Sequence, residues 1–161
     1  MKTIAALLTQ AEQIARARGT EQPAAEHLVL AALQLPDGTA AGALERLGSS
    51  AADFGAALDA QEVEDLERIG VRPDDDRISA ELPPPGEPVG IYRSDPSAQE
   101  LFQAAGDDAR REGGALVGAH VLRAAADLEH GPTARALRRL GIDRTELRSA
   151  ATAEIEARAG G

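Results

Sequence analysis

The sequence predicts an all-α fold in which two similar four-helix units pack together as one domain. Segments with apolar residues at every third or fourth position, the spacing of one helix face, occupy both ends of the chain. The apolar residues are mainly Ala, Leu, Val and Ile, because the chain has two Phe, one Tyr and no Trp, and Ala-rich helices can approach closely. The second half also repeats the pattern of the first at a constant offset of 93 residues.

The first half contains two predicted helices before a tight turn. Residues 3–18 carry the apolar stripe of an amphipathic helix, with Thr3 as the expected N-cap and Gly19 as the expected stop. Residues 24–35 are more uniformly apolar and predict a buried helix, which the turn at residues 36–38 (PDG) ends.

Two shorter helices complete the first unit. Residues 39–47 predict a helix that Gly48 stops. Residues 50–58 predict the next helix, with Ser50 as its N-cap. We therefore expect the first unit to span about residues 1–58.

The second half starts with Asp95 as an N-cap and Pro96 at the first helical position. Gly141 is the expected stop of its third helix, and Asp143 the expected cap of its fourth. The second unit is thus predicted to span about residues 95–158. Its four helices are expected at residues 96–112, 118–128, 132–140 and 143–157.

The two units correspond residue by residue. At the offset of 93, His27 matches His120 and Gly48 matches Gly141, and a gap-free match covers residues 24–58. A helical unit that repeats in this way buries its apolar face against its neighbour. We therefore expect a single pseudo-symmetric domain over residues 1–161.

A central segment, residues 59–94, separates the two units. Its first part predicts a helix that ends at Gly70, and the remainder is rich in Pro, Gly and charge, which predicts an exposed linker. The acidic run at residues 74–76 (DDD) lacks the glycine and the distal glutamate of a calcium-binding loop. We expect a solvated run there and not a metal site.

Composition excludes several classes of function. Binding to a phosphate backbone normally needs a basic excess, so the formal net charge of −10 argues against a nucleic-acid partner. No segment has the length of a membrane span or the pattern of a signal peptide, so we expect a cytoplasmic protein with no membrane partner. The chain has no Cys, and no other residues show the spacing of metal ligands or of a catalytic centre. We predict no enzyme, no metal and no cofactor.

Two motifs in the first unit, with echoes in the second, resemble a known family. Residues 25–33 (AEHLVLAAL) are similar to its T-E-H-[IL]-L-L-A-L-L motif, and residues 43–48 (ALERLG) to its A-L-x-x-L-G motif. Residues 119–122 and 136–143 repeat them. The chain thereby resembles the Clp amino-terminal (Clp repeat) domain, the substrate- and adaptor-docking module of bacterial Clp unfoldases. The resemblance implies about eight helices in two pseudo-repeats, and protein binding in place of catalysis.

The resemblance also implies a kind of partner. The Gly-rich loop of the Clp ATPase modules is absent from the sequence, so the chain is similar to a stand-alone, ATPase-less member, a type common in actinobacteria. We expect a protein or peptide partner, namely a Clp substrate, an adaptor or a Clp subunit, and a role in modulating Clp-dependent proteolysis. The alternative is a protein that sequesters small molecules or Clp-directed cyclic peptides.

Glu26 and His27 are the candidate ligand-binding residues. Some members of the family bind phosphoarginine at two equivalent sites, where the Glu of the motif grips the guanidinium. Glu26 matches that Glu, whereas Ala119 replaces it in the second unit, so we expect any ligand site on the first unit. The other interpretation of Glu26 is a favourable interaction with the helix dipole. His27 and His120 are otherwise expected to bond to a helix end or to pack between the units.

Overall fold

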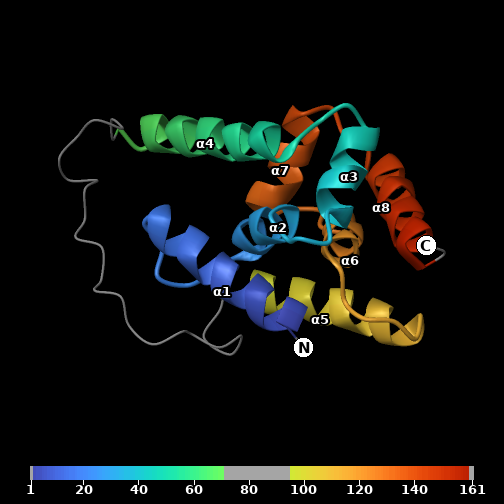
Figure 1. The fold of residues 1–161 in the computed structure, drawn as a ribbon. Coiled ribbons are helices and arrows are strands. Elements are labelled where there is room, and N and C mark those ends of the chain that lie inside the picture. Colours follow the sequence, from blue (N-terminus) through green and yellow to red (C-terminus); the bar gives the residue numbers. More distant parts are fainter. Residues whose placement is uncertain (1, 71–94, 160–161) are drawn as a thin grey trace.

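The protein is described here by a computed structural model that covers residues 2–70 and 95–159. In these residues the chain forms eight helices and no strand (Figure 1), which confirms the predicted all-α fold. The first copy of the repeat comprises α1–α4 and the second copy α5–α8. The helices are α1 (Lys2–Ala17), α2 (Ala25–Leu33), α3 (Thr39–Arg46), α4 (Ala51–Arg68), α5 (Pro96–Arg111), α6 (Gly118–Ala125), α7 (Gly131–Arg139) and α8 (Arg144–Ala159).

Most of the expected helix caps are present. Ser50 Oγ accepts a hydrogen bond from the N–H of Asp53 at 3.2 Å, and Asp95 Oδ1 accepts one from Ser97 at 2.9 Å. Asp143 caps α8 in the same way through the N–H of Glu146. Thr3 was wrongly predicted as a cap, because α1 already begins at Lys2.

Helix α4 differs most from the prediction. It was expected to stop near residue 58, with a separate helix in the linker, but it continues without a break to Arg68. Residues 59–68 contain strong helix formers and no Gly or Pro before Gly70, so nothing in them ends the helix. The first ten residues of the predicted linker therefore belong to the first copy. The linker prediction for residues 71–94, with its acidic run, lies outside the described residues.

The core lies around α2 and α6, which pack against each other at the centre of the molecule. Eight of the nine residues of α2 are buried. α1 covers α2, and α5 covers α6. The core consists of Ala, Leu, Val and Ile around one fully buried aromatic side chain, Phe54, among the described residues. Small side chains let the two central helices approach closely.

The fourth helix of each copy packs against the third helix of the other copy. α4 packs across α7, and α8 packs against α3 (Figure 1). α8 also packs closely against α6, the central helix of its own copy, whereas α4 has a much smaller contact with α2. The C-terminal half of α4 consequently extends past the core. Val63 and Ile69, at this end, are 39% and 72% exposed.

The offset between the copies changes by one residue in the first helices. Buried Leu7, Ala11 and Ala15 of α1 correspond to buried Leu101, Ala105 and Ala109 of α5, an offset of 94. The ends of these helices agree, since the N–H of residue 20 donates to the carbonyl of Ala15 and that of residue 114 to Ala109. The loop before α6 is thus one residue shorter than the loop before α2, and the offset of 93 holds from there on.

Within the described residues, no helix combines the length and the apolar character that a membrane crossing needs.

Candidate functional site

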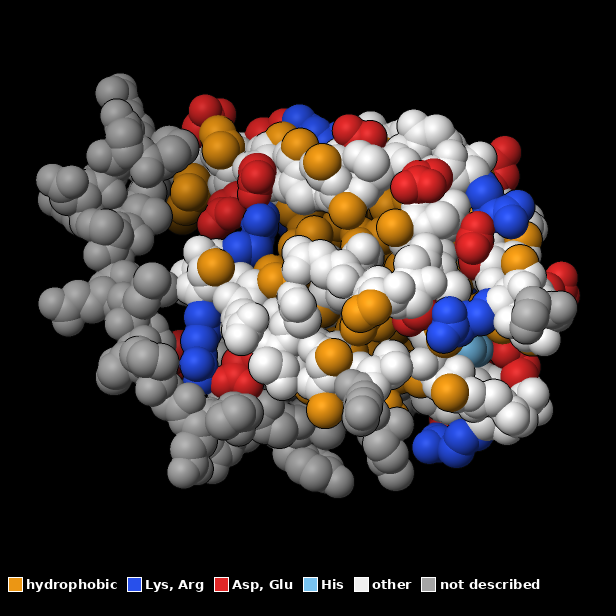
Figure 2. Space-filling model, in the orientation of Figure 1, with side chains coloured by type: hydrophobic (Ala, Val, Ile, Leu, Met, Phe, Trp, Pro, Cys, Tyr) orange, Lys and Arg blue, Asp and Glu red, His pale blue; other side chains and the backbone are white. Residues whose placement is uncertain are grey.

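A groove of about 340 Å³ lies where the first turn of α2 meets α4 and α7. It therefore sits between the two copies, below the protruding half of α4. Hydrophobic side chains are visible beneath α4 in the space-filling view (Figure 2). The apolar lining of the groove comes from Leu58, Leu66, Ile69 and Pro132. The volume is in the range of sites that hold small ligands or peptide side chains.

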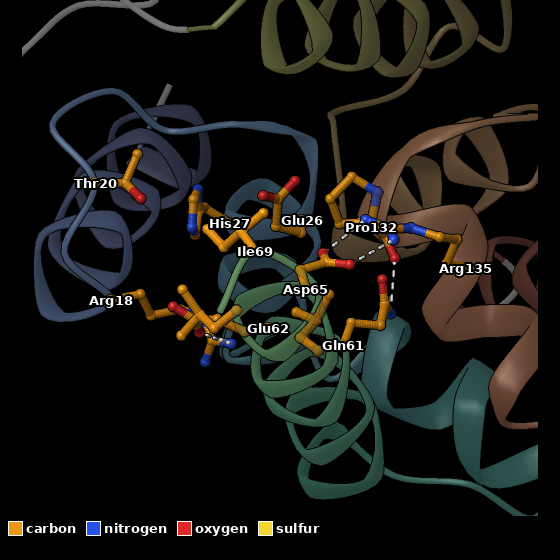
Figure 3. A pocket seen from close by; sticks show the side chains of 12 residues that line it. Arg18, Thr20, Glu26, His27, Gln61, Glu62, Asp65, Ile69, Pro132 and Arg135 are labelled. Atoms are coloured by element: carbon orange, nitrogen blue, oxygen red, sulfur yellow. Dashed lines mark hydrogen bonds and ion pairs between the residues drawn. The ribbon is translucent and has the colours of Figure 1, made fainter. Parts of the chain in front are cut away.

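Glu26 lines this groove from the first turn of α2 (Figure 3). The side chain is half-buried, and its carboxylate forms no ion pair with any residue that the structure describes. Burial raises the pKa of the Glu26 carboxyl above its usual value, and the charge of Asp95 adds to the shift, while a hydrogen bond from its own backbone N–H and the charges of Arg18 and Arg135 oppose it. Glu26 is thus a partly desolvated acid without a close cationic partner.

His27 lines the same groove but is only 3% exposed. Its Nδ1 accepts a hydrogen bond from the backbone N–H of Ala24 at 2.9 Å, which satisfies a free donor at the start of α2. Burial, together with the charge of Arg18, lowers the pKa of His27 to about 4. The ring is therefore neutral at neutral pH and serves as an acceptor at the helix end.

His120 makes the equivalent contact in the second copy. Its Nδ1 accepts a hydrogen bond from the N–H of Val117 at 3.0 Å, and its Nε2 lies 3.0 Å from Glu112 Oε2. Glu112 also binds Arg123 at 2.5 Å. Although burial opposes it, these hydrogen bonds from His120 and Arg123 hold the pKa of the Glu112 carboxyl below its usual value. His120 thus lies in a polar network away from the groove.

The position equivalent to Glu26 in the second copy is closed. Ala119 is fully buried, and its N–H donates to Thr39 Oγ1 at 2.8 Å. The neighbouring N–H of Gly118 donates to Asp37 Oδ2 at 3.2 Å. At the offset of 93, Pro132 of α7 corresponds to Thr39 of α3, so the position beside Glu26 lacks this hydroxyl acceptor. The open groove therefore lies at the first turn of α2, and the equivalent position at α6 is covered.

Ion pairs fix the protruding half of α4 above the groove. Arg18, just after α1, donates to Asp59 at 2.7 Å. From α7, Arg135 meets both carboxylate oxygens of Asp65 at 3.4 Å, and Arg139 donates to Glu64 at 2.7 Å. The hydrogen bond and the charge of Arg139 lower the pKa of the Glu64 carboxyl. These contacts set the distance between α4 and the rest of the groove.

Of the candidate residues predicted from the sequence, the structure places two in the groove and the others elsewhere. Glu26 and His27 both line the groove. Gly48 and Gly141 follow the third helices, with φ of 75° and 72°, a conformation that favours glycine at a helix end. Sequence reasoning missed Gln61 and Asp65 of α4, because their segment was assigned to the linker. Among the described residues, no group of three or more His, Asp or Glu is placed to hold a metal ion.

Comparison with known proteins identifies the family. The sequence pattern described as the Clp repeat (R) N-terminal domain matches residues 2–82, half of the chain. The chain belongs to this family. The match covers the whole first copy, including the groove residues on α2 and α4. A Clp repeat N-terminal domain is a protein-interaction module, and the chain is one of this kind.

A solved structure extends the similarity to both copies. The N-terminal domain of the caseinolytic protease-associated chaperone ClpD from Arabidopsis thaliana superposes with a TM-score of 0.60, at 16% identity, over 96% of each chain. At this identity the match shows a shared fold. No curated protein matches the chain. The Clp N-terminal fold therefore includes the second copy, which lies beyond the matched sequence pattern.

Proposed function

We propose that the groove binds a segment of a partner protein and that Glu26 pairs with a positively charged side chain of that segment. The observation that carries the proposal is the half-buried carboxylate of Glu26, which forms no ion pair with a described residue, beside an apolar lining. A buried charge without a partner is unfavourable, so a cationic group that enters the groove gains a desolvated electrostatic contact. The apolar lining would hold the neighbouring side chains of the segment.

The partner proposed is a Clp substrate, an adaptor or a Clp subunit. Membership of the Clp repeat N-terminal family supports a protein partner in general. The groove is made by both copies, so a bound segment would contact elements of each. Occupation of the groove is the means by which the chain would modulate Clp-dependent proteolysis.

Short labelled peptides test the binding proposal directly. We would measure fluorescence anisotropy with an Ala- and Leu-rich peptide carrying one central Arg or Lys, and with the same peptide carrying Gln. We expect the cationic peptides to bind more tightly, and Glu26→Gln to weaken their binding at least tenfold because a desolvated charge pair is lost. The melting temperature should stay nearly unchanged.

Glu45→Gln is the matched control. Glu45 is an exposed residue of α3 outside the groove, so this variant should bind like the wild type. Equal binding of cationic and neutral peptides, or equal affinity of the Glu26→Gln variant, would contradict the proposed role of Glu26.

The effect on proteolysis needs a second assay. Degradation of an unfolded reporter by the Clp unfoldase and protease of the same organism would be followed with and without the purified chain. We expect wild-type protein to change the rate and Glu26→Gln protein to have little effect. The same change with both proteins would exclude the groove as the cause.

A further inference from the structure

We infer that the protruding half of α4 is a docking surface for a basic amphipathic helix of a partner protein. The surface consists of an apolar ridge, formed by Val63, Leu66 and Ile69, and of the acidic side chains that flank it. The inference goes beyond the proposed function, because this surface does not include Glu26.

The apolar ridge is largely exposed. Val63 is 39% and Ile69 72% exposed, and these are the exposed large hydrophobic side chains of the described residues. Leu66 lies between them, half-buried at the margin of the groove. Residues three apart are neighbours on a helix surface, and rows with this spacing are the ridges that pack into the grooves of a second helix. The ridge therefore has the form that a partner helix can cover.

Contacts with α7 hold this half of α4 in place. Arg139 donates to Glu64 at 2.7 Å, and Arg135 contacts Asp65 at 3.4 Å. Gln61, one turn earlier, donates to the carbonyl of Pro132 at 3.2 Å. Because these contacts tie the helix to the second copy, a partner that binds the ridge does not have to order it first.

Acidic side chains flank the ridge and are not fully neutralised. Glu67 is exposed and forms no ion pair with a described residue. Glu62 is 56% exposed and lies 3.9 Å from Arg18, which binds Asp59 more closely at 2.7 Å. At 3.6 residues per turn, Glu62 and Glu67 lie on opposite sides of the ridge. Figure 2 shows hydrophobic and acidic side chains intermixed at this end of α4.

The charge of the surface indicates the chemistry of the partner. Residues 59–69 contain five acidic residues and one basic residue, and the basic residue, Arg68, lies 3.8 Å from Asp65. A helix with an apolar face and with Lys or Arg along both edges of that face would cover the ridge and pair with the free glutamates. An acidic helix would be repelled at the same positions.

Two labelled helical peptides of about 18 residues test the inference. Both carry Leu at every third or fourth position, and the edges of this stripe are Lys in one peptide and Glu in the other. Fluorescence anisotropy would be measured for the wild type, Ile69→Ser, Glu67→Lys, Glu26→Gln and the control Glu100→Lys, whose residue is exposed on α5. We expect the wild type, Glu26→Gln and the control to bind the Lys peptide alike, and the Glu peptide to bind far more weakly.

The two ridge variants should each weaken binding of the Lys peptide. Ile69→Ser should do so about tenfold, because an aliphatic side chain is no longer buried by the partner. Glu67→Lys should do so about two- to fivefold, the size of one surface ion pair, and added salt should reduce this difference. Both residues are exposed, so the melting temperatures should match that of the wild type.

Several outcomes would overturn the inference. If the Lys peptide does not bind, or binds Ile69→Ser as it binds the wild type, the ridge is not its docking surface. If Glu26→Gln abolishes binding, the peptide occupies the groove instead. If both peptides bind equally, the acidic flanks select no charge. If the wild type sediments as a dimer that Ile69→Ser dissociates, the occupant of the ridge is a second copy of the chain.

Discussion

His27 and His120 accept a hydrogen bond from the backbone N–H three residues earlier, at the start of the two central helices. Such a contact needs an unprotonated ring nitrogen. At His27 the pKa is lowered to about 4 by burial and by Arg18. Protonation therefore costs the folded state both the helix-end contact and the desolvation of a charge.

This shift predicts a pH dependence of stability. The pKa of His27 is about 4 in the folded state and 6.5 in the unfolded chain, so the unfolded state binds the proton first as pH falls. The contribution of His27 is fully present above pH 6.5 and is lost as pH falls toward 4, by about 3 kcal/mol. Urea unfolding between these pH values should show that loss in the wild type and a smaller one in His27→Gln.

His130→Gln is the control for this measurement, because His130 is exposed. Its stability should follow the wild-type curve. Parallel curves for the wild type and His27→Gln would show that His27 does not titrate in this window on unfolding.

The two main groove residues differ in how far sequence could identify them. Glu26 was identified because it occupies the Glu position of the family's T-E-H motif. Gln61 has no such signal, since a glutamine in a polar stretch predicts an exposed side chain. The burial of Gln61 and its hydrogen bond to the carbonyl of Pro132 depend on the packing of α4 against α7, which does not follow from local sequence.

Among the elements, α6 approaches α2 and α3 closely at Gly118. A Cβ built on Gly118 would lie 2.9 Å from the carbonyl oxygen of Ala32 and 2.9 Å from the Cβ of Ala40. Both obstacles are backbone or a rigid methyl group, so the helices must move apart. We expect Gly118→Ala to lower the free energy of unfolding by about 1–3 kcal/mol, as measured by urea denaturation.

Gly106→Ala is the matched substitution within α5. A Cβ there meets no atom within 4 Å, and Ala is the better helix former by roughly 0.5–1 kcal/mol. We expect Gly106→Ala to raise the free energy of unfolding. Destabilisation by both substitutions, or by neither, would contradict the close approach of α6.

The number and order of the helices follow from apolar periodicity, because a helix that faces a core records that face in its sequence. The length of α4 was underestimated for the same reason. Its second half lies beyond the core, held by Arg135, Arg139 and Arg18, so it carries little apolar pattern. Which helices pack together is also absent from local sequence, as the pairing of α4 with α7 shows.

At the scale of the molecule, α4 packs against α7 and α8 packs against α3, so each copy depends on a helix of the other. The single domain over residues 1–161 remains a prediction that fragments can test. We expect residues 1–70 and 95–161 to show little helicity when separate, because the apolar faces of α2 and α6 would be exposed. Circular dichroism of the mixed fragments should show recovered helix. A cooperative melting transition of either fragment alone would disprove this dependence.

The contact of each fourth helix with the third helix of the other copy can also be described in terms of quaternary structure. Two chains that exchange contacts in this reciprocal way would form an isologous dimer, in which every position must carry the same residue on both sides. Here both halves belong to one polypeptide, so matching positions are free to differ. Glu26 against Ala119 and Pro132 against Thr39 are such differences. They allow the groove at the first turn of α2 to stay open, whereas Asp37 and Thr39 of the first copy cover the equivalent position at α6.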